Sequence, residues 1–107
     1  MKYKNEKITY NGMTFDSKRE YGRYCELLLL ERAGKISDLQ RQVPYELIKA
    51  QYDGSRCVER ACNYVADFVY RENGKTIVED CKGFRTDVYK IKRKLMLERY
   101  GIRIRET

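Results

Sequence analysis

The sequence predicts an α/β (α+β) fold in which a central mixed sheet is flanked by helices. Asn73-Gly74 separates two apolar runs, 64–70 and 77–82, and this arrangement is typical of a β-hairpin with a two-residue loop. Two further stretches, 17–33 and 86–100, have helical composition, and each is followed by a glycine that fits a helix end. Strands and helices therefore alternate in the second half of the chain.

The N-terminal part predicts a short hairpin followed by the first helix. The segment 8–15 has Asn11-Gly12 between two apolar runs, which repeats the hairpin pattern. Ser17 is a favourable N-cap residue, and the helix is expected to end at Ala33 because Gly34 fits the position after the cap.

The middle of the chain predicts three strands. The segment 38–48 largely alternates apolar and polar residues, and Pro44 has no N–H group, so this strand should lie at an edge or carry a bulge. Residues 51–60 are polar and contain Asp53-Gly54, so we expect a loop there. The hairpin introduced above then covers about 62–82.

The C-terminal part predicts the second helix and a last strand. The helix is expected over 86–100, with Val88, Ile91 and Leu95 as its apolar stripe. Residues 102–105 alternate and predict a short strand. A helix before the last strand permits a parallel crossover, which is right-handed in nearly all proteins.

Composition limits the class of protein. With 107 residues the chain is large enough for one core, so we predict a single domain over 1–107. It has no apolar run near the roughly 20 residues of a membrane span and no signal-peptide pattern, which predicts a cytoplasmic protein with reduced thiols. Without histidine or a Cys-x-x-Cys pair, a structural zinc site is not expected, although four scattered thiolates stay open as ligands.

The net charge of +7 is concentrated towards the C-terminus. The segment 82–105 contains nine basic and two acidic residues, and clustered positive charge is typical of a nucleic-acid binder. A basic helix that is merely well solvated is the alternative. On the second helix, the side expected to face DNA holds Arg85, Tyr89, Lys92, Met96 and Arg99. The basic residues expected to bind DNA are Lys18, Arg85, Lys90, Lys92, Arg93, Lys94 and Arg99.

The central hairpin predicts a metal site. A two-residue loop places Asp67 directly opposite Asp80, where two carboxylates repel each other. Lys82 shares their face because side chains alternate along a strand. A cation between the acids would compensate for the repulsion. A loop longer by one residue would instead place Asp67 opposite Glu79 or Cys81.

A metal ion would also supply the chemistry, because the chain has no histidine to serve as a general base. Mg²⁺ prefers one or two carboxylates with waters and substrate oxygens. Asp67 and Asp80 could supply the carboxylates, and the backbone carbonyl of Cys81 could be a further ligand. Lys82 would position the attacking water or stabilise the charge that develops on the phosphoryl group.

Glu20 is a third candidate acid with two open roles. Ser17 and Glu20 match the capping box, in which the glutamate bonds back to the N-cap amide. The same carboxylate could instead reach the metal site from the start of the first helix.

These residues resemble the catalytic signature of the PD-(D/E)XK nuclease superfamily. Asp67 is followed by Asp80-Cys81-Lys82 at the end of a hairpin, and the segment 15–20 leading into the leucines 27–30 is similar to the superfamily's first helix. The resemblance covers about 13–101. It narrows to small phage and prophage endonuclease-like proteins through three further stretches: 66–68, 78–83 and 90–94.

The resemblance implies a restriction-endonuclease-like order (helix, three strands, helix, strand) and phosphodiester hydrolysis that depends on Mg²⁺ or Mn²⁺. It implies that Asp67 and Asp80 bind the metal, that Lys82 is the catalytic lysine and that Glu20 is the acid from the first helix. Two positions depart from the pattern. Ala66 stands where the superfamily name has proline, and the middle acid is Asp80 instead of the commoner glutamate.

The sequence thus predicts a Mg²⁺-dependent DNA endonuclease of phage or prophage origin, structure-specific for branched or junction DNA. A homodimer is expected if it cuts paired strands. Two alternatives stay open: a non-catalytic nucleic-acid-binding module that keeps the fold, and a phage accessory protein that binds a host protein through its basic helix.

Overall fold

The protein folds around a mixed sheet of four strands, which confirms the predicted α+β class. The computed structural model describes residues 7–107. Within that part of the chain, in order, the elements are β1 (Ile8–Tyr10), β2 (Met13–Phe15), α1 (Lys18–Arg32), β3 (Ser37–Ile48), β4 (Gln51–Asp53), β5 (Arg56–Glu59), β6 (Cys62–Glu72), β7 (Lys75–Asp80), α2 (Asp87–Tyr100) and β8 (Arg105–Glu106).

The strand order of the main sheet is β3-β6-β7-β8. The pairs β3–β6 and β6–β7 are antiparallel, and β7 pairs with β8 in parallel after the connection through α2, as predicted. β3 is an edge strand, which agrees with the expectation from Pro44. Within residues 7–107, neither helix is long and apolar enough to cross a membrane.

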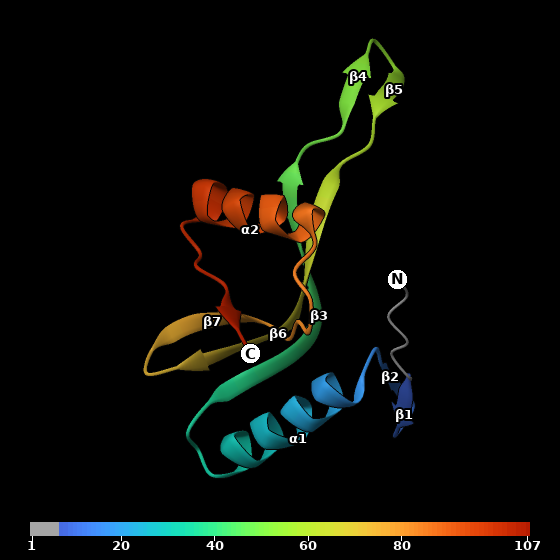
Figure 1. Ribbon diagram of the computed structural model, residues 1–107. Coiled ribbons are helices and arrows are strands. Elements are labelled where there is room, and N and C mark those ends of the chain that lie inside the picture. Colours follow the sequence, from blue (N-terminus) through green and yellow to red (C-terminus); the bar gives the residue numbers. More distant parts are fainter. Residues whose placement is uncertain (1–6) are drawn as a thin grey trace.

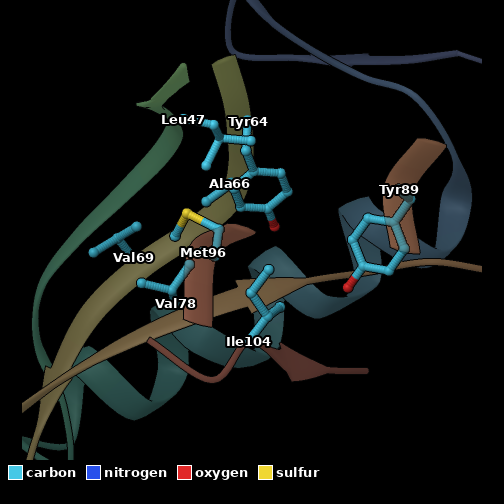
Figure 2. Packing of buried hydrophobic residues seen from close by; sticks show 8 residues of the cluster. All are labelled: Leu47, Tyr64, Ala66, Val69, Val78, Tyr89, Met96 and Ile104. Atoms are coloured by element: carbon cyan, nitrogen blue, oxygen red, sulfur yellow. The ribbon is translucent and has the colours of Figure 1, made fainter. Parts of the chain in front are cut away.

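The two helices pack on opposite faces of the main sheet (Figure 1). Ile77 contacts the cluster that contains α1, and its neighbour Val78 lies in the cluster that contains α2; consecutive strand residues point to opposite faces. The buried residues of the α1-side cluster are Leu27, Ile36, Phe68 and Tyr70. Those of the α2-side cluster, drawn in Figure 2, are Leu47, Tyr64, Ala66, Val69, Val78, Tyr89, Met96 and Ile104.

The central hairpin has the predicted register. Glu72 pairs with Lys75 and Phe68 pairs with Glu79 across a two-residue loop, in which Asn73 has φ 51° and Gly74 has φ 76°. These left-handed residues suit a type I′ turn. The paired ladder ends at Phe68 and Glu79, and the next step in the same register sets Asp67 against the end of β7.

Two predicted boundaries are wrong. Residues 51–59 form the β4–β5 hairpin instead of a loop, because Gly54, with φ 62°, makes a tight turn that lets the two flanking segments pair. The last strand covers Arg105–Glu106 instead of 102–105. The reason is that the amides of Gly101 and Ile102 donate to carbonyls of the last helical turn, so the chain is still capping α2 there.

The face of α2 that packs on the sheet also differs from the prediction. Tyr89 and Met96 are buried, while Val88 and Ile91 are 63% and 58% exposed, and Leu95 is only partly buried. The larger side chains fill the space above β6 and β7, and the helix has apolar residues on more than one side, so periodicity alone could not identify the buried side. The five residues that were predicted to face DNA together do not form one exposed side, because Tyr89 and Met96 are buried against the sheet.

Candidate functional site

Three of the four predicted catalytic side chains line one cavity of about 390 Å³. The cavity lies where α1 begins, where the pairing of β6 with β7 ends and where the chain leaves β7 for α2. Its lining residues are Asp16, Ser17, Arg19, Glu20, Asp67, Cys81, Lys82, Gly83, Phe84 and Thr86. Asp80 is not among them, but its carboxylate contacts Lys82 from the sheet.

The side-chain alternation of β6 is interrupted at Asp67. Ala66 packs in the α2-side cluster and Phe68 in the α1-side cluster, although residues two apart on a regular strand share a face. On the neighbouring strand Gln42 has φ 54°, a left-handed backbone that is uncommon outside glycine. The register is kept on both sides of this irregularity, by the pairs Arg41↔Phe68 and Val43↔Ala66. Irregular backbone of this kind is concentrated at functional sites.

The Asp67 carboxylate lies in the wall of the cavity, partly buried. Its Oδ2 accepts a hydrogen bond of 2.7 Å from the Cys81 amide. Burial raises the pKa of Asp67 to about 7; the hydrogen bond opposes this shift, and repulsion from Asp80 and Glu20 adds to it. Negative charge is therefore gathered here at an energetic cost that a bound cation would offset.

The Asp80 carboxylate is almost fully buried, with 1% of the residue exposed. The Tyr64 hydroxyl donates a hydrogen bond of 2.6 Å to Oδ2. Oδ1 is buried and accepts no hydrogen bond from the described residues; the Lys82 Nζ lies 3.7 Å away. Burial raises the pKa of Asp80. A buried carboxylate oxygen without a donor is unfavourable, so Oδ1 is suited to a cation.

Lys82 lies between the cavity and Asp80. Its Nζ is 3.7 Å from Asp80 Oδ1 and 5.5 Å from the centre of the Tyr89 ring. The side chain is 38% exposed, so the ammonium group is held near the acids and still meets solvent. It also lines an adjoining cavity of about 260 Å³ that includes Lys92. Lys82 can thus reach a phosphate placed beside the acids.

Glu20 has a capping contact at the start of α1 and lines the cavity. Ser17 Oγ accepts from the Glu20 amide at 3.2 Å, and Glu20 Oε1 accepts from the amide of Asp16, not of the N-cap residue, at 2.9 Å. Oε2 accepts from Gln42 Nε2 at 3.0 Å and lies 3.7 Å from the Arg41 guanidinium. Burial is the main reason that the pKa of Glu20 is raised. The capping function is present in shifted form, and metal binding by Glu20 stays a prediction.

Sequence reasoning missed the residues that orient these acids. Tyr64 holds Asp80, while Gln42 and Arg41 hold Glu20. Extending the β3–β6 register would have placed Gln42 opposite Asp67. Its left-handed backbone, however, has no signal in the sequence. No motif in the sequence points to Tyr64, because its contact with Asp80 runs across the strand pair.

The donor set fits a hard cation with few protein ligands. Among residues 7–107, no three His, Cys, Asp or Glu side chains form a cluster that could hold a metal ion. Mg²⁺, however, is usually bound through one or two carboxylates, with waters and substrate phosphates completing its shell. Asp67 and Oδ1 of Asp80, which accepts no hydrogen bond from the described residues, match that requirement. The Cys81 carbonyl stays a prediction as a further ligand.

The predicted DNA-binding residues fall into three groups. Arg85 and Arg93 each donate to Glu106 at 2.9 Å, and Arg99 lies 4.0 Å from Glu46, so these charges are partly compensated. Lys18 and Lys92 line cavities beside the site. The two that are exposed on the outer side of α2 are Lys90 and Lys94.

The comparisons with known proteins identify a family and little else. The family model described as "Protein of unknown function (DUF1064)" matches residues 1–106. No curated protein and no solved structure matches the chain.

Proposed function

This chain belongs to the DUF1064 family, and from its candidate site we propose that it is a metal-dependent endonuclease that hydrolyses phosphodiester bonds in DNA. Branched or junction DNA is the proposed substrate, and a homodimer would place two such sites on paired strands. The observation that carries the proposal is the buried Oδ1 of Asp80, which accepts no hydrogen bond from the described residues and has the Lys82 ammonium 3.7 Å away, beside the cavity that Asp67 lines.

Each proposed role follows from the contacts of the residue. Tyr64 binds one oxygen of Asp80 and the Cys81 amide binds one oxygen of Asp67, so each acid keeps its second oxygen for a metal. A bound Mg²⁺ would lower the pKa of water and neutralise charge on the phosphate. The Lys82 ammonium would stabilise the charge that develops on the phosphoryl oxygens, because it is held 3.7 Å from Asp80 and is open to solvent.

In this proposal Glu20 binds the metal only after one of its present hydrogen bonds is broken. Both of its oxygens already accept hydrogen bonds, from Asp16 and Gln42. It can join the metal shell only by releasing one of these donors, or it can act through a water in the cavity. Repulsion from Glu20 also adds, after burial and Asp80, to the raised pKa of Asp67.

The net charge of +7 supports DNA as the substrate. Basic side chains near the site would contact the phosphates flanking the scissile bond, which positions the duplex without reading its sequence. Arg19 lines the cavity itself, Lys18 and Lys92 line neighbouring cavities, and Lys90 and Lys94 are exposed on α2.

The test is a cleavage panel with supercoiled plasmid and a four-way junction, each with Mg²⁺, Mn²⁺ or EDTA. We expect metal-stimulated cleavage that is lost in Asp80→Asn and in Lys82→Ala, with folding checked by circular dichroism. Glu98→Gln is the matched control, because it removes one exposed carboxylate from the outer side of α2. Binding without cleavage under every metal condition would replace the nuclease proposal with a non-catalytic DNA-binding function.

A further inference from the structure

A smaller cavity adjoins the candidate site on the side of α2. It measures about 260 Å³ and shares the lining residues Lys82 and Thr86 with the cavity that Asp67 lines. Among the described residues, two lysines and no carboxylate line this smaller cavity; the second lysine is Lys92. The two cavities therefore lie side by side, and the Lys82 side chain borders both.

The charge of the smaller cavity suits an anion. Lys92 is only partly exposed and takes part in none of the ion pairs that the described residues form around α2. The Lys82 ammonium lies 3.7 Å from Asp80 and is still open to solvent. A phosphate between the two lysines would give Lys92 the counter-charge that residues 7–107 do not supply.

Exposed apolar side chains lie beside these lysines. Phe84 is 54% exposed and lines the cavity of the acids, while Val65 and Val88, 46% and 63% exposed, line the smaller cavity. Single exposed apolar residues are ordinary on a protein surface, but here three of them surround two adjoining cavities. A ligand with a negative charge next to a flat apolar face matches this combination, and a nucleotide of a single strand is such a ligand.

We propose that the site binds an unpaired nucleotide of branched DNA, with its base stacked on Phe84 and the neighbouring phosphate between Lys82 and Lys92; the inference rests on the proposed nuclease function. In a duplex each base is covered by its neighbours, so an aromatic ring can stack only on a base that has left the stack. Phe84 lies in the short connection between β7 and α2, two residues after Lys82. The base that it holds would thus be close to the bond that is cut, and this selects the single strand at a branch point.

Phe84→Trp gives a direct probe of stacking, because the chain has no tryptophan of its own. The variant is titrated in EDTA, so that no DNA is cut, with a single-stranded oligonucleotide, a splayed-arm duplex and a blunt duplex. We expect the first two to quench the indole emission and the blunt duplex to leave it unchanged, since stacking needs an accessible base. Equal quenching by the blunt duplex would overturn the inference.

Phe84→Leu removes the ring and keeps an apolar side chain. We expect roughly tenfold weaker binding of the single strand, measured by fluorescence anisotropy in EDTA, and unchanged affinity for the blunt duplex. Tyr52→Leu is the matched control, because it removes an aromatic ring that is 62% exposed in β4 and lines neither cavity. Thermal unfolding confirms that both variants are folded.

Lys92→Gln tests the phosphate position separately. It should lower the slope of log K against log salt for the single strand by about 0.7, the value for one phosphate contact on single-stranded DNA. Lys75→Gln removes the same charge from an exposed position at the start of β7, beside the hairpin turn, and should leave the slope unchanged. Equal slopes in the two variants would remove Lys92 from the proposed contact.

The outcomes separate this inference from the proposed function. If the wild type cleaves branched DNA and Phe84→Leu binds the single strand as tightly as the wild type, the stacking role is overturned and the nuclease stands. Indole emission of Phe84→Trp that changes with protein concentration, and not with DNA, would make this surface a contact between copies, which also overturns the inference. A wild type that neither binds nor cleaves DNA removes both.

Discussion

Tyr64 sets the direction of the Asp80 carboxylate. The hydroxyl of this buried tyrosine donates to Oδ2 at 2.6 Å, and this contact leaves Oδ1 as the oxygen available to a metal. The tyrosine would therefore act through Asp80 without touching the reacting atoms. Residues that orient metal ligands typically change metal affinity by 10–100-fold when they are removed.

Tyr64→Phe tests this positioning role. The variant removes only the hydroxyl, so we expect the core to keep its packing while Mn²⁺ binding weakens by roughly tenfold. Isothermal titration of the metal without DNA measures the affinity directly. Tyr45→Phe is the control, because its ring packs on Tyr100 at the edge strand, away from the acids. Unchanged Mn²⁺ affinity in Tyr64→Phe would show that Asp80 needs no such support.

Asp67 predicts a pH-dependent stability in the metal-free protein. Its pKa is about 7 in the folded state and 3.8 in its ordinary state, so between these values the folded chain binds a proton that the unfolded chain has lost. Stability therefore falls as pH rises from about 4 to 7. Asp67→Asn removes this loss, and we expect it to raise the free energy of unfolding at pH 8 by about 1–3 kcal/mol.

Urea unfolding in EDTA at pH 5 and pH 8 measures this difference. At pH 5 only part of the loss has occurred, because the unfolded Asp67 is ionised and the folded one is still protonated, so the variant should gain less than at pH 8. The gain at pH 8 should shrink when Mg²⁺ is added, because the metal stabilises only the wild-type carboxylate. An Asp67→Asn variant that is less stable than the wild type at pH 8 contradicts the charge argument.

An ion pair between Arg23 and the buried Glu79 connects helix α1 to β7. Arg23 Nε donates to Glu79 Oε1 at 2.6 Å and a second guanidinium nitrogen donates to Oε2 at 3.3 Å, while the Tyr70 hydroxyl donates to Oε2 at 2.9 Å. Glu79 is fully buried on the face opposite Asp80. This pair fixes the beginning of α1, and hence Glu20, against the strand that carries Asp80.

Arg23→Met should destabilise the protein by about 3 kcal/mol, because it leaves the buried Glu79 without a counter-charge. The midpoint of urea unfolding at constant m-value measures the loss. Arg32→Met is the control, since Arg32 is exposed in the last turn of the same helix. The double variant Arg23→Met with Glu79→Gln should recover part of the stability, and no recovery would show that packing, not charge, is what Arg23 supplies.

At the scale of the whole molecule, the fold was more predictable than its contacts. The register around Asn73-Gly74 was found because turn chemistry is local, and the ends of α1 followed from Ser17 and Gly34. The buried face of α2 could not be predicted from the sequence, because the shape of the sheet below the helix determines that Tyr89 and Met96 are buried. The same limit applies to Tyr64, whose partner lies on β7, and to Gln42, whose partner lies in α1.

The distribution of charge predicts how DNA binding should respond to salt. Lys94 is exposed on α2 and has room to contact a phosphate, so Lys94→Gln should lower the slope of log K against log salt by about one. Lys35→Gln removes the same charge beyond the far end of α1 and should leave the slope unchanged. Anisotropy titrations at several NaCl concentrations give both slopes, and equal slopes would exclude Lys94 from the interface.

The parallel pairing of β7 with β8 connects the site to residues 105–107. The Thr107 amide donates to the Asp80 carbonyl at 3.0 Å, and Glu106 accepts from Arg85, Tyr89 and Arg93. On the ribosome, these residues are synthesised after every candidate catalytic group. A nascent chain would thus carry all of these acids while one edge of β7 was still unpaired, and the site would be complete only after residues 105–107 had been made and had paired with it.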